Sequence, residues 1–309
     1  MKLSIVSTLY QSAACIAKFH QRASAAARQL VGDEYEIILV NDGSPDNSLD
    51  IAVQLTKTDS HVVVIDLSRN FGHHKAMMTG LAQAGGERIF LIDSDLEEEP
   101  EWLISFSEQM NQEKCNVVFG VQEKRKGNWF ERWSGELHYR MLDLMMNVHH
   151  PRNITTARLM DKRYVEALLL HKEREIVISG LWIITGFNQH SQIVRKKTHS
   201  KTTYSIFHKF SHLANAVTSF SIKPLLAIFF TGLTFFILSF SWASFLVVNR
   251  LFFSKALAGW TSVMVSVWLL GGIIISFIGV IGIYLAKIFI ETKQRPYTII
   301  KDIYDGSKQ

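Results

Sequence analysis

The chain has few cysteines, and it carries little excess charge of either sign. Only two cysteines, Cys15 and Cys115, occur among 309 residues, which argues against a disulfide framework and a thiolate metal site. The formal net charge of +5 is small for a nucleic-acid binder, so no nucleic-acid partner is expected. A hydrophobic content of 48% is sufficient for a sizeable core, in one large domain or two smaller ones.

Charged residues are absent from two long stretches in the C-terminal third. Residues 225–248 contain none, and neither do residues 256–286. Each stretch exceeds the roughly 20 residues with which a helix crosses a bilayer. The alternative is a buried hairpin of core helices, but two adjacent runs of this length would need a much larger soluble protein to cover them. The sequence therefore predicts two transmembrane helices within residues 224–287.

Basic residues gather on one side of this predicted hairpin. Lys223 and Lys287 flank it, and further lysines and arginines lie at 195–209 and 293–301, whereas the link at 249–255 holds two. The positive-inside rule then predicts a multi-pass protein of the inner (cell) membrane with both termini in the cytoplasm. The basic residues also suit anionic lipid headgroups, so the lipid bilayer is an expected partner. The apolar stretch after Lys2 is too short for a signal peptide.

Two further stretches carry apolar residues at helical spacing. Residues 203–222 combine an apolar side with basic residues just before the first long apolar run. This pattern predicts an amphipathic interfacial helix in a juxtamembrane segment, residues 201–223. Residues 128–148 carry a similar apolar stripe, which is typical of a helix packed on a sheet or lying on the membrane.

In residues 1–200, short apolar runs alternate with helix-length segments. The runs begin near residues 2, 35, 61, 88 and 116, and the intervening helices are expected at 12–30, 47–57, 73–84 and 100–112. Strands that are nearly all apolar indicate a parallel sheet covered on both faces, an α/β fold. The sequence thus predicts a cytosolic domain at 1–200 and a cytosolic tail at 288–309.

Polar clusters follow three of these predicted strands. They read "NDGSPDNS" from residue 41, "SRNFGHHK" from residue 68 and "DSDLEEEPE" from residue 93. In parallel sheets, ligands bind at the carboxyl edge of the strands. Asp93 and Asp95 stand one residue apart at such an end, so both can turn toward one pocket. Carboxylates favour hard cations such as Mg²⁺ or Mn²⁺, which in turn bridge phosphates.

Together with "ETKQRPY" at residue 291, these clusters resemble the polyprenyl-phosphate glycosyltransferases, inverting family 2 enzymes with the Rossmann-like GT-A fold. The resemblance covers nearly the whole chain and extends to dolichol-phosphate mannose synthase and bactoprenol glucosyltransferase. It implies that Asp42 contacts the nucleotide base, Asp93 the ribose or the metal, and Asp95 the metal. It also implies a donor pocket lined by Arg69, Asn70, Gly72 and His73.

The chain departs from the family pattern at two places. The family commonly reads "DADLQDPPE" where this chain has "DSDLEEEPE", so Glu97 replaces a glutamine. Relatives tend to have Asp-Phe-Arg-Leu where this chain has Thr-Ala-Arg-Leu from Thr156, which removes a carboxylate. Arg158 remains, either as a partner for phosphate or as a structural arginine. Residues 97–101 are expected to begin the next helix, where acidic side chains suit the helix dipole.

Acceptor binding is expected in "VRKKTHSKTTY", where relatives carry basic residues and a Ser-Lys-Tyr element. By resemblance, the acceptor-phosphate candidates are Arg195, Lys197, Lys201 and Tyr204. A solvated basic face against lipid headgroups is the alternative for any one of them.

The predicted reaction transfers a sugar from a nucleotide-diphosphate donor to polyprenyl phosphate, with inversion and with a divalent cation. Asp95, Arg158 and Thr156 are the catalytic candidates. Two alternatives stay open: a processive polysaccharide synthase, and a non-catalytic membrane partner that retains nucleotide binding. The synthase would be expected to carry Gln-x-x-Arg-Trp, and "WFERW" from residue 129 lacks the glutamine. A homo-oligomer is compatible with every one of these interpretations.

Overall fold

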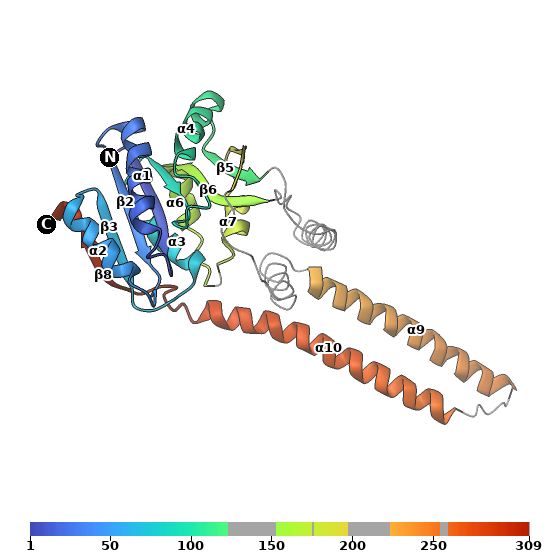
Figure 1. The fold of residues 1–309 in the computed structure, drawn as a ribbon. Coiled ribbons are helices and arrows are strands. Elements are labelled where there is room, and N and C mark those ends of the chain that lie inside the picture. The colour runs from blue at the N-terminus through green and yellow to red at the C-terminus, as the bar shows by residue number, and fades with distance from the viewer. Residues whose placement is uncertain (123–152, 175, 197–222, 254–258, 309) are drawn as a thin grey trace. The chain divides into compact units, whose positions relative to one another are not determined.

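The computed structural model describes residues 1–122, 153–174, 176–196, 223–253 and 259–308 (Figure 1). Its described residues form two compact units, one made of residues up to 196 together with 295–308, and the other containing two long helices. The expected alternation of strands and helices is confirmed in the first unit. Its elements are β1 (Leu3–Leu9), α1 (Ile16–Val31), β2 (Tyr35–Asn41), α2 (Ser48–Thr58), β3 (Val62–Leu67), α3 (His73–Gln83), β4 (Arg88–Leu91), α4 (Trp102–Glu113), β5 (Val117–Gln122), β6 (Ile154–Asp161), α6 (Lys162–Leu169), α7 (Ile178–Ile184), β7 (Gln189–Val194), β8 (Ile300–Asp305) and the 3₁₀ turn η1 (Gly306–Lys308).

The strands form one eight-stranded sheet in the order β7-β5-β6-β4-β1-β2-β3-β8. The five strands expected from the sequence, β1 to β5, all run in the same direction, but the sheet as a whole is mixed. β6 runs antiparallel to both β4 and β5, and β8 runs antiparallel to β3. Neither β6 nor β8 was among the strands expected from the apolar runs, so the antiparallel part of the sheet is an addition to the prediction.

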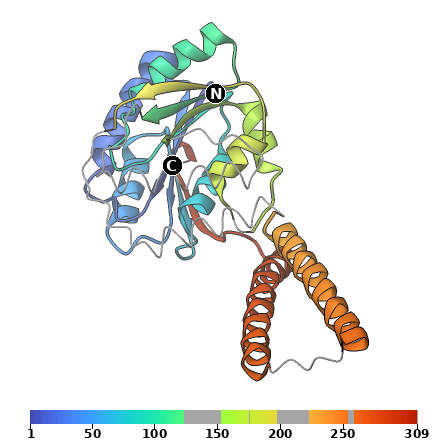
Figure 2. The ribbon, with the colours of Figure 1, turned by 90° about the vertical axis from the view of Figure 1, so that its right-hand side faces the viewer.

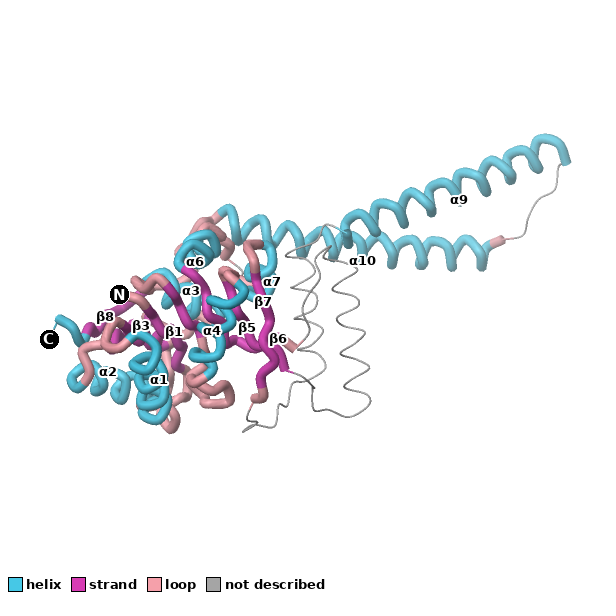
Figure 3. Tube along the Cα trace, turned by 90° about the horizontal axis from the view of Figure 1, so that it is seen from above, coloured by secondary structure: helices cyan, strands magenta, loops and turns pink. Residues whose placement is uncertain are grey.

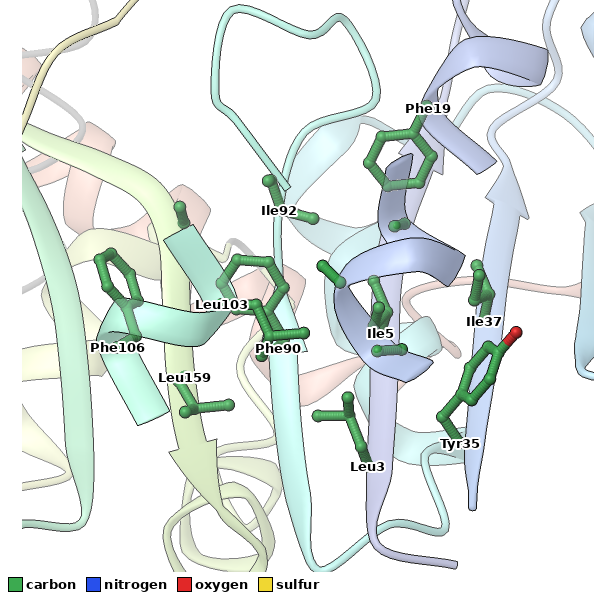
Figure 4. Packing of buried hydrophobic residues seen from close by; sticks show 14 of the residues in the cluster. Leu3, Ile5, Phe19, Tyr35, Ile37, Phe90, Ile92, Leu103, Phe106 and Leu159 are labelled. Atoms are coloured by element: carbon green, nitrogen blue, oxygen red, sulfur yellow. The ribbon is translucent and has the colours of Figure 1, made fainter. Parts of the chain in front are cut away.

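Helices cover both faces of this sheet. α1, α2 and α4 pack on one face, and α3, α6 and α7 lie on the other (Figure 3). On the first face, Phe90 of β4 meets Phe106 of α4 edge-on, with ring centroids 6.1 Å apart. Leu3, Ile5 and Leu159 complete this part of the core (Figure 4). The fold is therefore the expected α/β, Rossmann-like arrangement, and its core fixes where each strand ends.

The C-terminal residues return to the sheet edge beside β3. The backbone N–H of Ser68 donates to the carbonyl of Ile299 at 2.9 Å, and β8 then pairs along β3. Nζ of Lys301 lies 3.2 Å from Oδ2 of Asp66, a side chain that is almost fully buried. The segment that the sequence presented as a tail thus contributes a strand to the eight-stranded sheet.

The second unit consists of α9 (Lys223–Phe253) and α10 (Trp260–Thr292), which contact each other as antiparallel helices (Figure 2). By length and composition, one span among the described residues could cross a membrane, Leu270–Thr292 within α10. The part of α9 that meets the same apolar criterion, Lys223–Phe235, is shorter. The predicted interfacial helix at 203–222 and the stripe at 128–148 lie outside the described residues.

Candidate active site

The predicted site residues converge because of the strand directions. β1, β2, β3 and β4 are parallel, so their carboxyl ends share one edge of the sheet. β6 is antiparallel to β4 and therefore begins at this edge, whereas β7, parallel to β5, ends there. Residues that are far apart in sequence, such as Asp42, Asp93, Thr156 and Lys196, meet along this edge.

Asp42 connects the segments that follow β2 and β3. Its buried carboxylate accepts the backbone N–H of Phe71 at 2.7 Å and that of Gly72 at 3.0 Å. Next to it, Gly43 has a φ of 59°, and a Cβ there would lie 2.4 Å from the backbone nitrogen of Asn70. The two segments are thus packed backbone to backbone, with no room for a side chain between them. Asp42 positions the loop that precedes α3, and its contact with a nucleotide base stays a prediction.

Arg69 and Asn70, at the tip of this loop, are exposed. The guanidinium of Arg69 lies over the ring of Phe71, 4.3 Å from its centroid. The structure therefore brings the predicted donor-pocket segment to the carboxyl edge of the sheet, where these side chains are open to solvent.

His73, the first residue of α3, lies between β1 and β4. Its Nδ1 is 2.9 Å from the hydroxyl of Thr8, and its Nε2 is 3.2 Å from Oδ1 of Asp93. Burial would lower the pKa of His73, but the contact with Asp93 and the nearby acidic charges raise it above its usual value. His73 is therefore protonated more readily than a free histidine, and it lies beside the first aspartate of the Asp-Ser-Asp turn.

Asp93 is more buried than Asp95. Burial would raise the pKa of Asp93, but its contacts with His73 and Thr156 and the charge of Lys196 lower it. His73 is poorly aligned for hydrogen bonding, so buried Oδ1 of Asp93 has no hydrogen-bond partner among the described residues. With only the 3.2 Å contact to Nε2 of His73, this buried oxygen can accept a further ligand, and a cation is one such ligand.

Asp95 is the exposed carboxylate of the Asp-Ser-Asp turn. Ser94 points the other way and donates to the carbonyl of Thr8 at 2.9 Å, which fixes the turn on β1. Partial burial and the charges of Asp93 and Glu97 raise the pKa of Asp95. Among the described residues, no group of three or more His, Cys, Asp or Glu side chains is arranged to hold a metal. Two carboxylates nevertheless fit Mg²⁺, which usually takes one or two from the protein and its other ligands from water and phosphate.

Glu98 is buried at the site, and the expectation that residues 97–101 begin the next helix was wrong. α4 begins at Trp102, and Glu98 is 0% exposed. Its carboxylate accepts the backbone N–H of Thr156 at 3.0 Å and that of Ala157 at 2.7 Å. Burial and the charge of Asp93 raise the pKa of Glu98 to about 7. Two backbone N–H groups of β6 bind this carboxylate inside the protein, whereas a position in the first turn of α4 would have left it in solvent.

Lys196 supplies a positive charge at the end of β7. Its Nζ lies 3.3 Å from Oε1 of Glu98 and 3.6 Å from Oε2 of Glu97. Burial would lower the pKa of Lys196, but the charges of Glu98 and Asp93 raise it. The neighbouring candidate Arg195 is exposed, and Lys197, Lys201 and Tyr204 lie outside the described residues.

Arg158, the remaining catalytic candidate, is 1% exposed. Its guanidinium carbon lies 3.0 Å from the centroid of the Trp182 ring, and its Nε has no hydrogen-bond partner among the described residues. Burial lowers the pKa of Arg158 to about 9. The side chain is covered by Trp182 of α7, and its predicted contact with phosphate stays a prediction.

Comparison with known proteins identifies the domain that carries this edge. The family model described as "Glycosyl transferase family 2" matches residues 4–169, more than half of the chain. The chain belongs to glycosyltransferase family 2. The resemblance drawn from the sequence motifs is therefore confirmed at the level of the family, and the chain is an enzyme of the transferase class.

Relatives align with this family 2 chain over nearly its whole length. A protein of Mycobacterium tuberculosis (strain CDC 1551 / Oshkosh) named "Putative glycosyltransferases" is 51% identical over 304 residues, covering 98% of this chain and 89% of the relative. The "SfII prophage-derived bactoprenol glucosyl transferase" of Shigella flexneri is 27% identical over 309 residues, covering 99% of this chain and 100% of the relative.

Among solved structures, S. aureus TarS 1–349 in complex with UDP-GlcNAc is similar with a TM-score of 0.47 and 15% identity. The similarity covers 71% of this chain and 66% of that chain. A similarity at this level says nothing about the substrate of the present enzyme.

Sequence reasoning missed two residues of this family 2 site, Glu98 and Lys196. Both stand in runs of like charge, "EEE" and "RKK", in which each member has the same chemistry. A signal was present for Glu98, because it lies only three residues after Asp95 and cannot be far from the turn. The sequence contained no corresponding signal for Lys196, since the direction of the Lys196 side chain depends on where β7 ends.

Proposed function

We propose that this enzyme transfers a sugar from a nucleotide-diphosphate donor to polyprenyl phosphate at the cytoplasmic face of the inner (cell) membrane, with inversion. The observation that carries the proposal is the acidic pair Asp93 and Asp95 with His73 and the cation Lys196 beside it at one sheet edge. A metal-bound diphosphate and an attacking phosphate need this combination of charges. The full-length alignment with a relative named for transfer to bactoprenol supports the choice of acceptor.

The donor side of the site would be built from the segments after β2 and β3. Asp42 holds the loop of Arg69 and Asn70 in place through Phe71 and Gly72. The exposed side chains of this loop are suited to contact the nucleotide. Asp93 and Asp95 would hold Mg²⁺ or Mn²⁺, which supplies charge stabilisation for the leaving diphosphate.

The acceptor side would be built from the end of β7 and the basic residues that follow it. Lys196 and Arg195, with Lys197, Lys201 and Tyr204 as further candidates, belong to a basic stretch that precedes the predicted membrane segments in the sequence. A phosphate monoester has a second pKa of about 6, so most of it carries no proton at neutral pH. Such a nucleophile needs positioning rather than a base, and Thr156 can therefore stand where relatives tend to have a carboxylate.

Arg158 would support this arrangement from within the fold. It lies two residues after Thr156 on β6, so both side chains point to the same face of the sheet. Its burial under Trp182 favours a supporting role over contact with the acceptor phosphate in this conformation.

Membrane attachment would come from α9 and α10 as a transmembrane hairpin. Both helices exceed 30 residues, and each contains an uncharged run longer than a bilayer requires. The flanking lysines favour placing the catalytic unit and both termini on the cytoplasmic side. Self-association into a homo-oligomer is compatible with this placement.

The test of this function measures nucleotide release by the purified full-length protein in detergent. UDP-, GDP- and dTDP-sugars are supplied with Mg²⁺ or Mn²⁺, with and without undecaprenyl phosphate. The proposal predicts release that requires both the metal and the lipid phosphate. Release that is indifferent to the lipid would contradict the acceptor, and no release with any donor would favour the non-catalytic alternative.

A further inference from the structure

Glu98 connects three separate segments of the catalytic edge. It lies in the turn between β4 and α4, it accepts backbone N–H groups from β6, and it contacts Lys196 beyond β7. Its side chain is fully buried, whereas the Lys196 side chain is 23% exposed. A buried carboxylate is costly unless it is fully hydrogen-bonded, so its presence calls for a reason beyond filling space.

The backbone of β6 explains why an acceptor is needed at this position. β4 ends at Leu91, which is the register partner of Arg158, so no β4 residue lies opposite Thr156. On the other side, the register between β5 and β6 shifts between Phe119 and Val121. The N–H groups of Thr156 and Ala157 are therefore left at an irregular end of the strand, and Glu98 takes both of them.

A neutral acceptor could satisfy those two amides, but it would attract the ammonium of Lys196 only weakly. The ammonium lies 3.3 Å from Oε1 of Glu98, the same oxygen that accepts the N–H of Thr156 at 3.0 Å. An ammonium has three donors, so Lys196 can keep this contact and still donate to a second anion. One anionic side chain thus fixes both the start of β6 and a cation.

We propose that Glu98 is a positioning residue that holds Lys196 and Thr156 beside Asp93, so that Lys196 can bind a phosphate group of a substrate. This inference rests on the proposed function. The phosphate belongs either to the donor diphosphate or to the lipid acceptor, which present the same chemistry to an ammonium. Glu98 itself touches neither, because it is enclosed by β6 and Lys196.

The experiment compares four variants of the full-length protein: Glu98→Gln, Lys196→Gln, the double variant, and Glu108→Gln as a control. Glu108 is exposed on α4 and offers the same loss of charge away from the catalytic edge. Turnover, the KM for each substrate, the melting temperature, and the affinity for inorganic pyrophosphate with Mg²⁺ are measured for every variant.

We expect Glu98→Gln to lower kcat/KM about tenfold, comparable to the loss in Lys196→Gln, because Glu98 acts by positioning that cation. Lys196→Gln should raise the KM of one phosphate substrate about tenfold, since it removes a charged donor from that phosphate. Because Glu98 acts through Lys196, the kcat/KM of the double variant should be no lower than that of the less active single variant. Glu108→Gln should have the kcat/KM of the wild type. A higher KM for the nucleotide sugar alone assigns Lys196 to the diphosphate, and a higher KM for the lipid alone assigns it to the acceptor.

Two results would overturn the inference: unchanged KM values in Lys196→Gln, or losses that multiply in the double variant. If Glu98→Gln does not fold, Lys196→Gln decides by the same KM criterion. If the wild type transfers no sugar, the proposed function fails and pyrophosphate affinity becomes the readout. A pyrophosphate affinity about tenfold lower in Lys196→Gln then supports the inference that Lys196 binds phosphate, and an unchanged affinity overturns it.

Discussion

Replacing Arg158 by methionine should stabilise the protein while slowing catalysis. The arginine is fully buried, its Nε has no hydrogen-bond partner among the described residues, and its guanidinium stacks on Trp182. Methionine has a similar length and adapts to irregular space, so it can occupy the site without a charge. Neutral replacements of buried charges are often stabilising, whereas ordinary core substitutions are not.

The magnitude follows from the cost of the buried charge. A pKa of about 9 for Arg158, against a usual 12.5, corresponds to about 5 kcal/mol against the charged folded form. The cation–π contact with Trp182 offsets about 2 kcal/mol of this cost. Because the folded pKa is the lower one, the penalty is complete below pH 9 and disappears as the pH approaches 12.5. At neutral pH, Arg158→Met should therefore raise the free energy of unfolding by roughly 1–3 kcal/mol.

The assay is a thermal melt of the full-length protein in detergent, with turnover measured in parallel. A gain of this size should raise the melting temperature by roughly 3–8 °C. Arg88→Met is the control, because Arg88 donates to Ser107 at 2.9 Å and also to Asn111, and its loss should be destabilising. We expect Arg158→Met to reduce turnover about threefold, like Thr156→Ala, since the change disturbs the face of β6 that carries Thr156. A lower melting temperature for Arg158→Met would refute the reasoning, because it would show that the guanidinium has adequate partners.

Three further variants test separate parts of the account. Asp95→Asn should melt like the wild type but lose metal-dependent turnover by at least about a hundredfold, and near-normal rates would remove Asp95 from the metal site. Thr156→Ala should cost about threefold in kcat, because no proton is abstracted from the phosphate; a loss like that of Asp95→Asn would contradict this. Deleting residues 295–309 removes β8 and the partner of Asp66. It should destabilise the protein by about 3 kcal/mol, measured by melting, and an unchanged melt would show that β8 is dispensable.

The sequence predicted the parts of the site that depend on strand ends. Asp42, the loop at 69–73, and the pair Asp93 and Asp95 each follow an apolar run directly, and the structure brings all of them to one edge. This succeeded because burial of a strand on both faces is visible in its composition, and the end of a strand is visible as the first polar cluster.

Other parts of the fold and of the site depend on which strands pair with each other, and amino-acid composition does not determine this pairing. The sequence analysis predicted neither β6 nor β7, and the directions of these strands are set by the neighbours that they join. β8 lies after the longest apolar helix, where its alternating residues resembled a tail. Glu98 was misjudged for the same reason, since its role depends on two amides of β6 that the irregular strand end leaves without partners.

The central claim is that polyprenyl phosphate accepts the sugar, and mass spectrometry of the lipid product tests it most directly. Wild-type protein and Asp95→Asn are incubated with undecaprenyl phosphate, a divalent cation and the panel of nucleotide sugars, and the lipid fraction is analysed. The account predicts one new species in the wild-type reaction, heavier than the acceptor by one sugar residue, with the anomeric configuration opposite to that of the donor. A product carrying several sugars, or a lipid fraction unchanged with every donor, would contradict it.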